Sequence, residues 1–487
     1  MSTIPENYGL FINGEERPSA GGGSFEVLSA WTRQPVAKIA QGNADDANAA
    51  IDAAHRAYQT WSETAPAVRE GVLLKASELM QVPETVERMV AVLIQESGST
   101  AQKARFEVAN VAARLRTAAG EASRMYGETF PNDKPHRMSI VIREPLGVVV
   151  AISPFNASLA LLAKMSIYAL AAGNTVVAKP SSETPLIAIE FAKVLHAAGL
   201  PAGCFNVIPG PGAQVGDTLI HHDKIEGIAF TGSTETGSRI AAIGAAKMRR
   251  MQMELGGKNP LIVLGDVDPV KAAHIAAAGA FFHAGQICMA STRMIVEESV
   301  KDAFVKALVE KANSLHFGEP TDPKTAYGPV INEGALRKII SHVDGARENG
   351  AQIMCGGEIV RGLIYKPTVV LEPPRDRGVW REETFGPVAS VVGVKDLNEA
   401  IALANDSEYG LSAGVLTNDM VRALTAARKI RAGAVHLGTH SFQSDALSPV
   451  GGVGASGFGR SGGKYSVEHF TELKWISIEL GEQPLPF

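Results

Sequence analysis

The segment Gly147-Val148-Val149-Val150-Ala151-Ile152-Ser153 is a continuous apolar run without alternating polar residues. A strand that is apolar on both faces is buried on both faces, as in a parallel sheet covered by helices. A helical pattern over 157–172 follows it, and then a second apolar strand at Thr175–Lys179. Strand, helix and parallel strand in this order are the repeating unit of a doubly wound α/β domain.

Strand and helix patterns continue to alternate after this unit. The next expected elements are a helix over 185–198, strands over 204–208 and 226–230, and a helix from about residue 234. A second series runs from about residue 258 to 440, with strands at Leu261–Leu264 and Arg293–Glu297. Two series predict two α/β domains, because 487 residues exceed what one hydrophobic core usually organises.

The N-terminal region is expected to add short strands and helices to the first domain. Tyr8–Gly14 reads as a strand that enters an Asn-Gly turn, and short strands are expected within 25–39. From Asn43 apolar residues recur every three or four positions, and helical patterns continue over Arg69–Met80 and Val86–Ser97.

One segment is typical of a strand that leaves the body of a domain. Arg137–Glu144 alternates apolar and polar residues after a polar linker that runs from Pro131 to Pro135. Such strands often pair with another subunit; the alternative is an ordinary edge strand.

Composition excludes several classes of protein. With 45% hydrophobic and 20% charged residues, the chain is expected to be ordered and globular. The net charge is −5 without a long run of one sign, so neither nucleic acid nor a membrane is an expected partner. No secretory signal pattern or bilayer-length apolar run is evident, so a cytoplasmic location is expected.

Cysteine usage agrees with a reducing compartment. Cys204, Cys288 and Cys355 are odd in number and lack the spacing of a disulfide framework or a zinc site. No metal is expected.

Cys288 stands in the apolar segment Gly279–Met289, directly after Gly285-Gln286-Ile287. A nucleophilic thiol requires close backbone approach and a donor for a developing oxyanion, and this glycine and amide offer both. Taken alone, the segment is more typical of a buried packing cysteine.

A second segment, Met253–Pro260, places Glu254 in an apolar strand that ends at Gly256-Gly257, 34 positions before Cys288. A carboxylate at a strand end in a cleft suits a general base, whereas the alternative is a glutamate that caps the next element. The two segments together resemble the glutamate and cysteine motifs of the aldehyde dehydrogenase superfamily. The resemblance extends from Phe11-Ile12-Asn13-Gly14 to Phe470–Lys474.

This resemblance implies a reaction and a fold. Cys288 would attack an aldehyde carbonyl, the amide of Asn156 would hold the oxyanion, and Glu254 would activate water to release a free carboxylic acid. The implied architecture is a Rossmann-type cofactor domain, an α/β catalytic domain and a small β oligomerisation arm of a homodimer or homotetramer. The expected boundaries are 1–125 and 145–257 for the NAD(P)-binding domain, 258–455 for the catalytic domain, and 126–144 with 465–487 for the arm.

The resemblance also implies cofactor contacts at strand ends. Gly232 and Ser233 lie between a strand and a helix, where free N–H groups suit a phosphate; read alone, they form a helix cap. Glu383 and Phe385 match residues that bind the nicotinamide ribose and flank the nicotinamide. The expected cofactor-binding residues are Ser153, Phe155, Lys179, Ser181, Ser182, Gly212, Gly232, Ser233, Leu255, Glu383 and Phe385.

Ser182 bears on the choice between NAD and NADP. Relatives that prefer NAD often carry a glutamate three positions after the residue matched by Lys179, where it repels a 2′-phosphate. Ser182 removes that repulsion, so NADP is expected to be accepted unless Glu183 points inward.

The late segment Pro449–Gly463 bears on the substrate. Its sequence motifs Gly-Ala-Ser-Gly and Gly-Arg-Ser-Gly-Gly resemble those of the benzaldehyde, salicylaldehyde and vanillin dehydrogenase branch. Gly438 and Val450 differ from the residues usual in that branch. An aromatic aldehyde is therefore the expected substrate. The residues expected to line its pocket are Leu161, Lys164, Ile287, Met289 and Phe442.

Lys164 lies eight residues after Asn156, on the same face of the expected helix. It is expected to meet a polar ring substituent or a carboxylate of the substrate, and the alternative is a pair with a structural acid. Two further alternatives are a semialdehyde dehydrogenase, whose substrate carboxylate would need such a cation, and a non-catalytic protein that has kept the fold.

Overall fold

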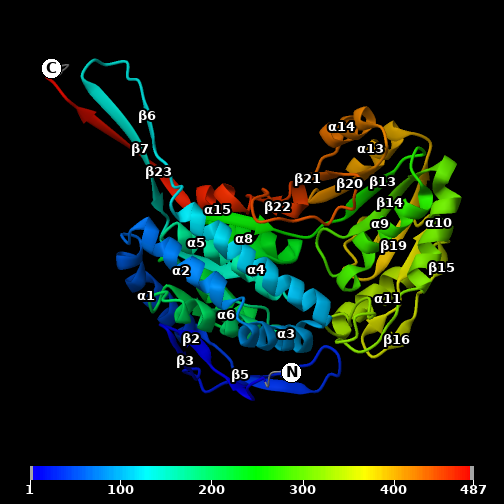
Figure 1. Ribbon diagram of the computed structural model, residues 1–487, viewed down its shortest axis with the longest axis horizontal. Coiled ribbons are helices and arrows are strands. Elements are labelled where there is room, and N and C mark those ends of the chain that lie inside the picture. Colours follow the sequence, from blue (N-terminus) through cyan, green and yellow to red (C-terminus); the bar gives the residue numbers. More distant parts are fainter. Residues whose placement is uncertain (1–3, 483–486) are drawn as a thin grey trace.

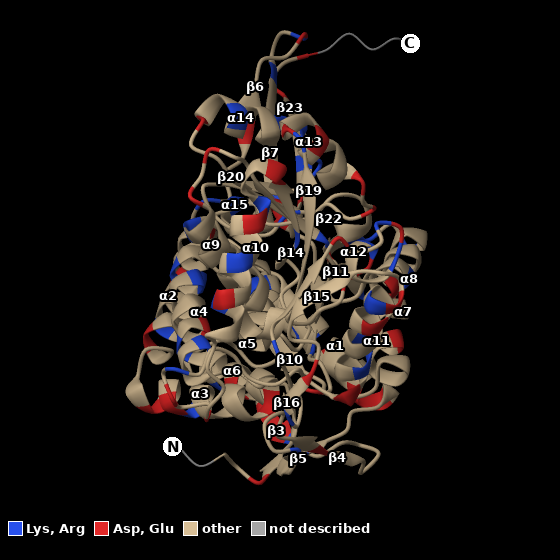
Figure 2. Ribbon diagram, turned by 90° about the vertical axis from the view of Figure 1, so that its right-hand side faces the viewer, with Lys and Arg blue, Asp and Glu red and all other residues tan. Residues whose placement is uncertain are grey.

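The computed structural model describes residues 4–482 and 487, and contains two α/β bodies side by side with a long β arm (Figure 1). Lys and Arg residues are interspersed with Asp and Glu residues over the side of the molecule in Figure 2. Within the described residues, no helix is both long enough and apolar enough to cross a bilayer.

The first body is built on an eight-stranded sheet. Five consecutive strands are parallel, and the strand next to them on each side is antiparallel; the last strand at one edge pairs antiparallel with its own neighbour. From edge to edge they are β22 (Gly457–Phe458), β12 (Arg250–Glu254), β11 (Ile225–Thr231), β8 (Val148–Ile152), β9 (Thr175–Lys179), β10 (Phe205–Val207), β2 (Leu10–Ile12) and β3 (Glu15–Arg17).

Helices cover both faces of this sheet, which confirms the expectation drawn from its apolar strands. Val149 and Ala151 of β8 pack into one core, and Val148 and Val150 pack into the other. The first core also takes residues from α2 (Pro66–Leu79), α3 (Pro83–Ser97), α4 (Ala101–Ala122), α5 (Ser158–Ala171) and α6 (Leu186–Ala197). The second takes residues from α1 (Ala44–Trp61), α7 (Asp217–His221) and α8 (Thr234–Ala246).

The second body has a seven-stranded sheet that is parallel except for one edge strand. Its strands, in order, are β15 (Gln352–Cys355), β18 (Thr368–Leu371), β19 (Val388–Val394), β14 (Ser291–Glu297), β13 (Asn259–Val263), β20 (Ser412–Leu416) and β21 (Ala434–Leu437). The helices around it are α9 (Pro269–Phe281), α10 (Glu298–Asn313), α11 (Glu333–Glu348), α12 (Gly378–Arg381), α13 (Leu397–Asn405) and α14 (Met420–Lys429).

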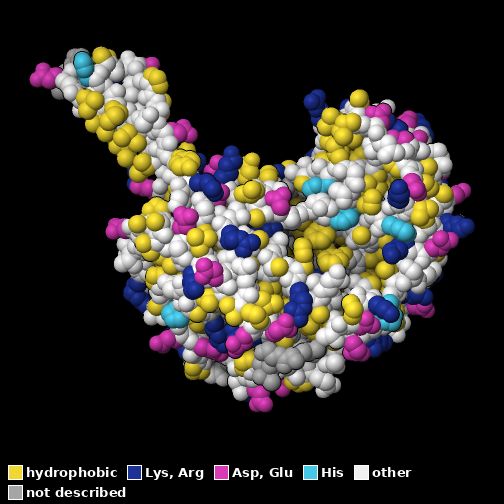
Figure 3. Space-filling model, in the orientation of Figure 1, with side chains coloured by type: hydrophobic (Ala, Val, Ile, Leu, Met, Phe, Trp, Pro, Cys, Tyr) yellow, Lys and Arg dark blue, Asp and Glu magenta, His cyan; other side chains and the backbone are white. Residues whose placement is uncertain are grey.

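The arm is a three-stranded antiparallel sheet of β6 (Glu128–Phe130), β7 (Arg137–Pro145) and β23 (Thr471–Glu479). Hydrophobic side chains lie along it (Figure 3), and Leu473 and Trp475 are each 60% exposed. The second part of the arm was expected from residue 465, but α15 (Gly463–His469) lies against α4 and α5 and the strand begins after it. Residues 483–486 of the expected arm, like residues 1–3 of the expected cofactor domain, lie outside the described residues.

The remaining short elements lie at the margins. β1 (Asn7–Tyr8), β5 (Pro35–Ala40) and β4 (Ser24–Leu28) form a small sheet, and β16 (Ile359–Arg361) pairs with β17 (Ile364–Tyr365).

The helix α4, which has 22 residues, was not expected from the sequence.

Helix α5 begins with a cap that comes from α4. Its own N-cap residue, Ala157, supplies no side-chain hydrogen bond. Instead, one carboxylate oxygen of Glu107 accepts the backbone N–H groups of Leu159 and Ala160, each at 3.0 Å. The other oxygen is 2.5 Å from the Lys103 ammonium in a buried ion pair. A negative charge at this helix end is favourable because the N-terminus of a helix is partly positive.

We expect Glu107→Ala to lower the free energy of unfolding by about 3–5 kcal/mol, because it leaves a buried ammonium and two N–H groups without their acceptor. Urea unfolding followed by circular dichroism measures the change. Glu87→Ala is the matched control, since Glu87 pairs with Arg105 at the exposed surface and should matter little. Equal effects of the two substitutions would contradict this account of the cap.

Candidate active site

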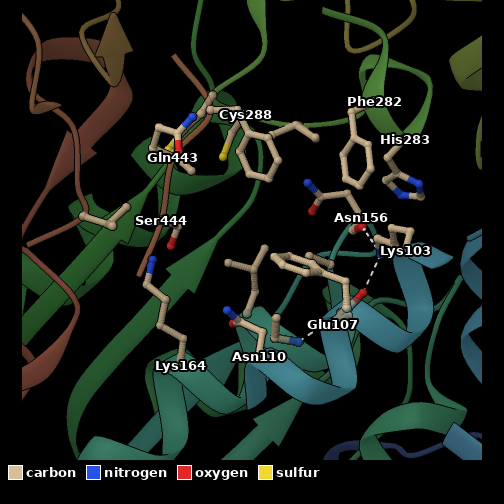
Figure 4. A pocket seen from close by; sticks show the side chains of 18 of the residues that line it. Lys103, Glu107, Asn110, Asn156, Lys164, Phe282, His283, Cys288, Gln443 and Ser444 are labelled. Atoms are coloured by element: carbon tan, nitrogen blue, oxygen red, sulfur yellow. Dashed lines mark hydrogen bonds and ion pairs between the residues drawn. The ribbon is translucent and has the colours of Figure 1, made fainter. Parts of the chain in front are cut away.

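A cavity of about 320 Å³ lies where the two bodies meet (Figure 4). Its walls come from α4, α5, the end of β12, the loop after α9 and the segment after β21. Cys288, Glu254 and Asn156, which are far apart in sequence, all line it. So do the five residues expected in the substrate pocket, namely Leu161, Lys164, Ile287, Met289 and Phe442.

The loop that carries Cys288 turns sharply after α9. His283 and Ala284 have left-handed backbone angles, with φ of 50° and 55°, and Gly285 has φ of 67°. A Cβ atom on Gly285 would lie 2.1 Å from the carbonyl oxygen of Gly386, so a larger residue does not fit. This turn sets the half-buried thiol of Cys288 on the wall of the cavity.

Gln286 anchors this loop rather than offering its amide to the reaction. Its side chain is buried, and its Nε2 donates to the carbonyls of His283 and Pro329 at 3.3 Å each. Its Oε1 accepts the N–H of Ile331 at 2.9 Å. The suggestion from sequence that this amide is a free donor beside the thiol is therefore wrong.

Asn156 precedes α5 and lies beside the nucleophile loop. Its side-chain Nδ2 donates to the carbonyl of Gln286 at 2.8 Å, and its own carbonyl accepts the Lys103 ammonium at 3.0 Å. A primary amide has two N–H groups, so one hydrogen of Nδ2 is left for another acceptor.

Glu254, the last residue of β12, is held by three groups. One carboxylate oxygen is 2.8 Å from the Lys164 ammonium. The other accepts the Gln252 amide at 3.2 Å and the hydroxyl of Ser461. A carboxylate offers about four acceptor positions, so one is left for a water molecule.

A second group of residues lies at the carboxyl edge of the first sheet. Ser153 directly follows β8, Lys179 ends β9 and Leu255 follows β12. Ser233 follows β11 and caps α8 by accepting the N–H of Thr236. Parallel strands bring these ends together at one edge, which is where open α/β sheets bind ligands. The exposed Gly212 begins a short π-helical turn (Gly212–Gly216) near this edge, and Gly216 packs beside the Lys179 side chain.

The second body contributes Glu383 and Phe385. The carboxylate of Glu383 accepts the N–H of Gly257 at 2.9 Å, and burial raises the pKa of this carboxyl. The ring of Phe385 meets that of Phe155 edge to face, with centroids 5.8 Å apart. These contacts bring the two bodies together at the junction between β12 and β13.

Comparison with known proteins identifies the family to which this chain belongs. A family model described as "Aldehyde dehydrogenase family" matches residues 17–476. The chain belongs to the aldehyde dehydrogenase family. It is therefore an enzyme of a class that uses NAD or NADP, and the alternative of a non-catalytic protein with this fold is set aside.

Individual relatives are similar over nearly their full length. A vanillin dehydrogenase of Pseudomonas fluorescens is 38% identical over 482 residues, which are 98% of this chain and 99% of the relative. A succinate-semialdehyde dehydrogenase [NADP(+)] of Escherichia coli is 35% identical, over 96% of this chain and 97% of the relative. The crystal structure of a salicylaldehyde dehydrogenase from Pseudomonas putida G7 with salicylaldehyde is 36% identical, with a TM-score of 0.96 over 99% of this chain and 100% of that one.

Around Lys179, this aldehyde dehydrogenase presents a cation and no facing carboxylate. Lys179 is buried, which lowers the pKa of its ammonium to about 8, and its Nζ donates only to the Pro180 carbonyl, at 3.3 Å, among the described residues. Ser182 is exposed, and Ser181 accepts the N–H of Glu183. The Glu183 carboxylate accepts the side-chain amide of Asn332 at 2.8 Å.

The thiol of Cys288 is protonated at neutral pH in this environment. Burial is the largest of the effects that raise its pKa to about 12. The negative charges of Glu254 and Glu383 also raise this pKa, and together they outweigh the lowering by Lys164. His283 also lines the cavity, but no hydrogen bond joins it to Cys288 in the described structure, and burial lowers the pKa of its imidazole. A Cys–His pair is thus not formed.

Sequence reasoning missed several residues that build the site. Asn259 donates from Nδ2 to the carbonyls of Cys288 and Ala290, at 2.8 and 3.0 Å, and positions the nucleophile loop. Ser461 holds Glu254, and α4 contributes the polar wall of the pocket. Asn259 is the second residue after Gly256-Gly257, so a polar residue at a buried strand start was the available signal.

We expect alkylation of Cys288 by iodoacetamide to accelerate about tenfold per pH unit from about pH 7 to pH 10, since only the thiolate reacts. Glu254→Gln should speed labelling at a given pH, because the Glu254 charge raises the pKa of the thiol. Peptide mass spectrometry distinguishes Cys288 from Cys204 and Cys355. A labelling rate that levels off below pH 8 would contradict the raised pKa.

Proposed function

We propose that the enzyme oxidises an aromatic aldehyde to the free carboxylic acid with NAD or NADP. The observation that carries this proposal is the meeting of Cys288, Asn156 and Glu254 in one cavity with aromatic walls. Phe282 stacks on Phe442 with ring centroids 6.0 Å apart, and His440 also stacks on Phe442, with ring centroids 6.1 Å apart. A cavity lined by rings and apolar side chains suits a flat aromatic substrate.

The residues divide the chemistry in the following way. The Cys288 thiol releases its proton to water as its sulfur bonds to the aldehyde carbon, and the free hydrogen of the Asn156 amide and the Cys288 N–H stabilise the oxygen as it becomes negative. NAD or NADP supplies the hydride acceptor when bound. Glu254 then takes a proton from a water molecule that attacks the thioester carbon, and the acid leaves as the Cys288 thiol is restored.

The coenzyme site favours acceptance of NADP alongside NAD. Lys179 is a buried cation, Ser182 is neutral, and Glu183 is engaged by Asn332. A 2′-phosphate would therefore meet a positive charge without a facing carboxylate. Gly232, Ser233 and the N-terminus of α8 would hold the pyrophosphate, since a helix N-terminus presents backbone N–H groups and a partial positive charge to an anion.

The arm supports assembly into a homodimer or homotetramer. Its β7 and β23 strands form a ribbon whose exposed side chains include Leu473 and Trp475, and such a surface is usually covered by another subunit. The three free cysteines fit the reducing cytoplasm.

A semialdehyde is the second candidate substrate. The observation that favours it is the presence of the cationic residues Lys103, Lys164 and Arg114 on the cavity wall. A linear semialdehyde would leave the stacked rings of Phe282 and Phe442 without an aromatic partner.

The proposed function is tested by Glu254→Gln. With benzaldehyde in excess we expect a burst of about one reduced coenzyme per active site and then little turnover, because the thioester forms but lacks the base that activates water. Stopped-flow absorbance at 340 nm measures the burst, and Cys288→Ala is the control that should give none. Full steady-state turnover by Glu254→Gln would overturn the role given to Glu254.

Coenzyme choice is tested by Ser182→Glu. We expect its kcat/KM with NADP to fall about tenfold or more relative to that with NAD, because a carboxylate repels the 2′-phosphate. Ser182→Gln has the same length without the charge, so it should retain more of the NADP activity than Ser182→Glu. Equal losses in the two variants would show that size rather than charge acts at this position.

A further inference from the structure

Arg114 on α4 is a buried cation in the wall of the substrate cavity. Arg114 lines the pocket, and the residue is only 4% exposed. Its Nε donates to the Asn110 side-chain oxygen at 2.6 Å, and its Nη2 donates to the Ser444 hydroxyl at 2.8 Å. Its Nη1 is buried and has no hydrogen-bond partner among the described residues.

The other two cations of the cavity are neutralised. Lys103 pairs with Glu107 at 2.5 Å, and Lys164 pairs with Glu254 at 2.8 Å. The partners of Arg114 are both neutral, and no acidic side chain of residues 4–482 lies within 4.0 Å of its guanidinium. Asp445, the nearest acid along that segment, is bonded to Ser448 and to the backbone of its own turn. Glu254 and Asp445 act on Arg114 only through their charges at longer range, so no ion pair within the described residues neutralises this cation.

Such an arrangement is unfavourable in the free protein. A buried guanidinium with an unused N–H loses hydration that neutral partners replace only in part. A carboxylate is the group that matches a guanidinium best, because it accepts charge-assisted hydrogen bonds from adjacent N–H groups. A ligand carboxylate beside Nη1 would satisfy the free donor and the charge together.

Arg114 lies along α4 where it could contact a ring substituent of the substrate on the side away from the aldehyde group. Lys103, which contacts Asn156, lies about three helical turns before Arg114. Asn110 and Lys164 stand across the cavity from Cys288 in Figure 4, and Arg114 is bonded to Asn110 on that side. A ring held with its aldehyde at Cys288 would thus direct a distal substituent toward the guanidinium.

We propose that Arg114 is a specificity-determining residue that binds a carboxylate on the ring of the aldehyde substrate, so that the preferred substrates are carboxylated aromatic aldehydes. This inference rests on the proposed function, since it takes the aldehyde to be aromatic and bound at Cys288. Asn110 and Ser444 act as positioning residues that fix the guanidinium plane.

The test compares each acid with its neutral amide of the same shape. Steady-state kcat/KM is measured for benzaldehyde, 3- and 4-formylbenzoate, and 3- and 4-formylbenzamide. We expect the wild-type enzyme to favour at least one acid over its amide about tenfold or more, and Arg114→Met to abolish that ratio through a loss of about 10- to 100-fold with the acid. Arg114→Lys keeps the positive charge but loses the planar set of N–H donors of the guanidinium, so it should retain part of the preference for the acid over the amide.

Arg116→Met is the matched control, because Arg116 lies on the exposed face of the same helix and donates to Ser77 instead of lining the cavity. It should leave the acid-to-amide ratio unchanged. A purely structural role for Arg114 would lower activity with all five aldehydes by one factor and leave the ratio intact, which would overturn the inference.

The outcomes also separate this inference from the proposed function. If the wild-type enzyme oxidises benzaldehyde but treats acids and amides alike, the role of Arg114 is wrong and the proposed function stands. If it oxidises none of the five but oxidises succinic semialdehyde, the aromatic assignment fails and the inference fails with it. Should Arg114→Met not fold, the wild-type ratio and the Arg114→Lys variant still decide.

Discussion

The active site depends on one buried amide, the side chain of Asn259. It stands where the chain passes from the first sheet to the second, and it binds the carbonyls of Cys288 and Ala290 and the N–H of Ser412. The nucleophile loop is thus tied to the junction between the two bodies. Gly257 makes this approach possible, because a Cβ atom there would lie 2.4 Å from the Cys288 carbonyl oxygen.

Around this anchor, the cavity is organised by charge in a water-poor space. The ion pair with Lys164 fixes the carboxylate of Glu254. In the Lys103–Glu107 pair, Glu107 caps α5 and Lys103 donates to the carbonyl of Asn156. Because an ion in such a space is stable only beside a partner, each pair also restricts where its side chains point. Burial in this cavity raises the pKa of the Cys288 thiol.

The sequence predicted those parts of the site that are local in the chain. The apolar strand at Val148–Ile152 and its helix were recognisable because their periodicity is set by burial on both sheet faces. Cys288 and Glu254 were recognisable because the nearby glycines, Gly285 and Gly256-Gly257, indicate close approach of the backbone. Helix α4 was missed, and with it Arg114, since a helix with apolar and charged residues on several faces does not reveal which charge faces a cavity. The use of Gln286 as an anchor was hidden because its partners Pro329 and Ile331 lie 43 and 45 positions away in the chain.

By itself, then, the sequence determined the two α/β series, because short-range patterns encode burial and turns. The resemblance of its motifs identified the family and predicted the thiol, amide and carboxylate of its chemistry. Only the tertiary structure decided which charges are paired. Lys164 meets Glu254, Glu183 meets Asn332, and Arg114 meets no acid among the described residues. Hydrogen bonds and ion pairs act over a few ångströms in space, and residues 90 or 149 positions apart come that close only after the chain has folded.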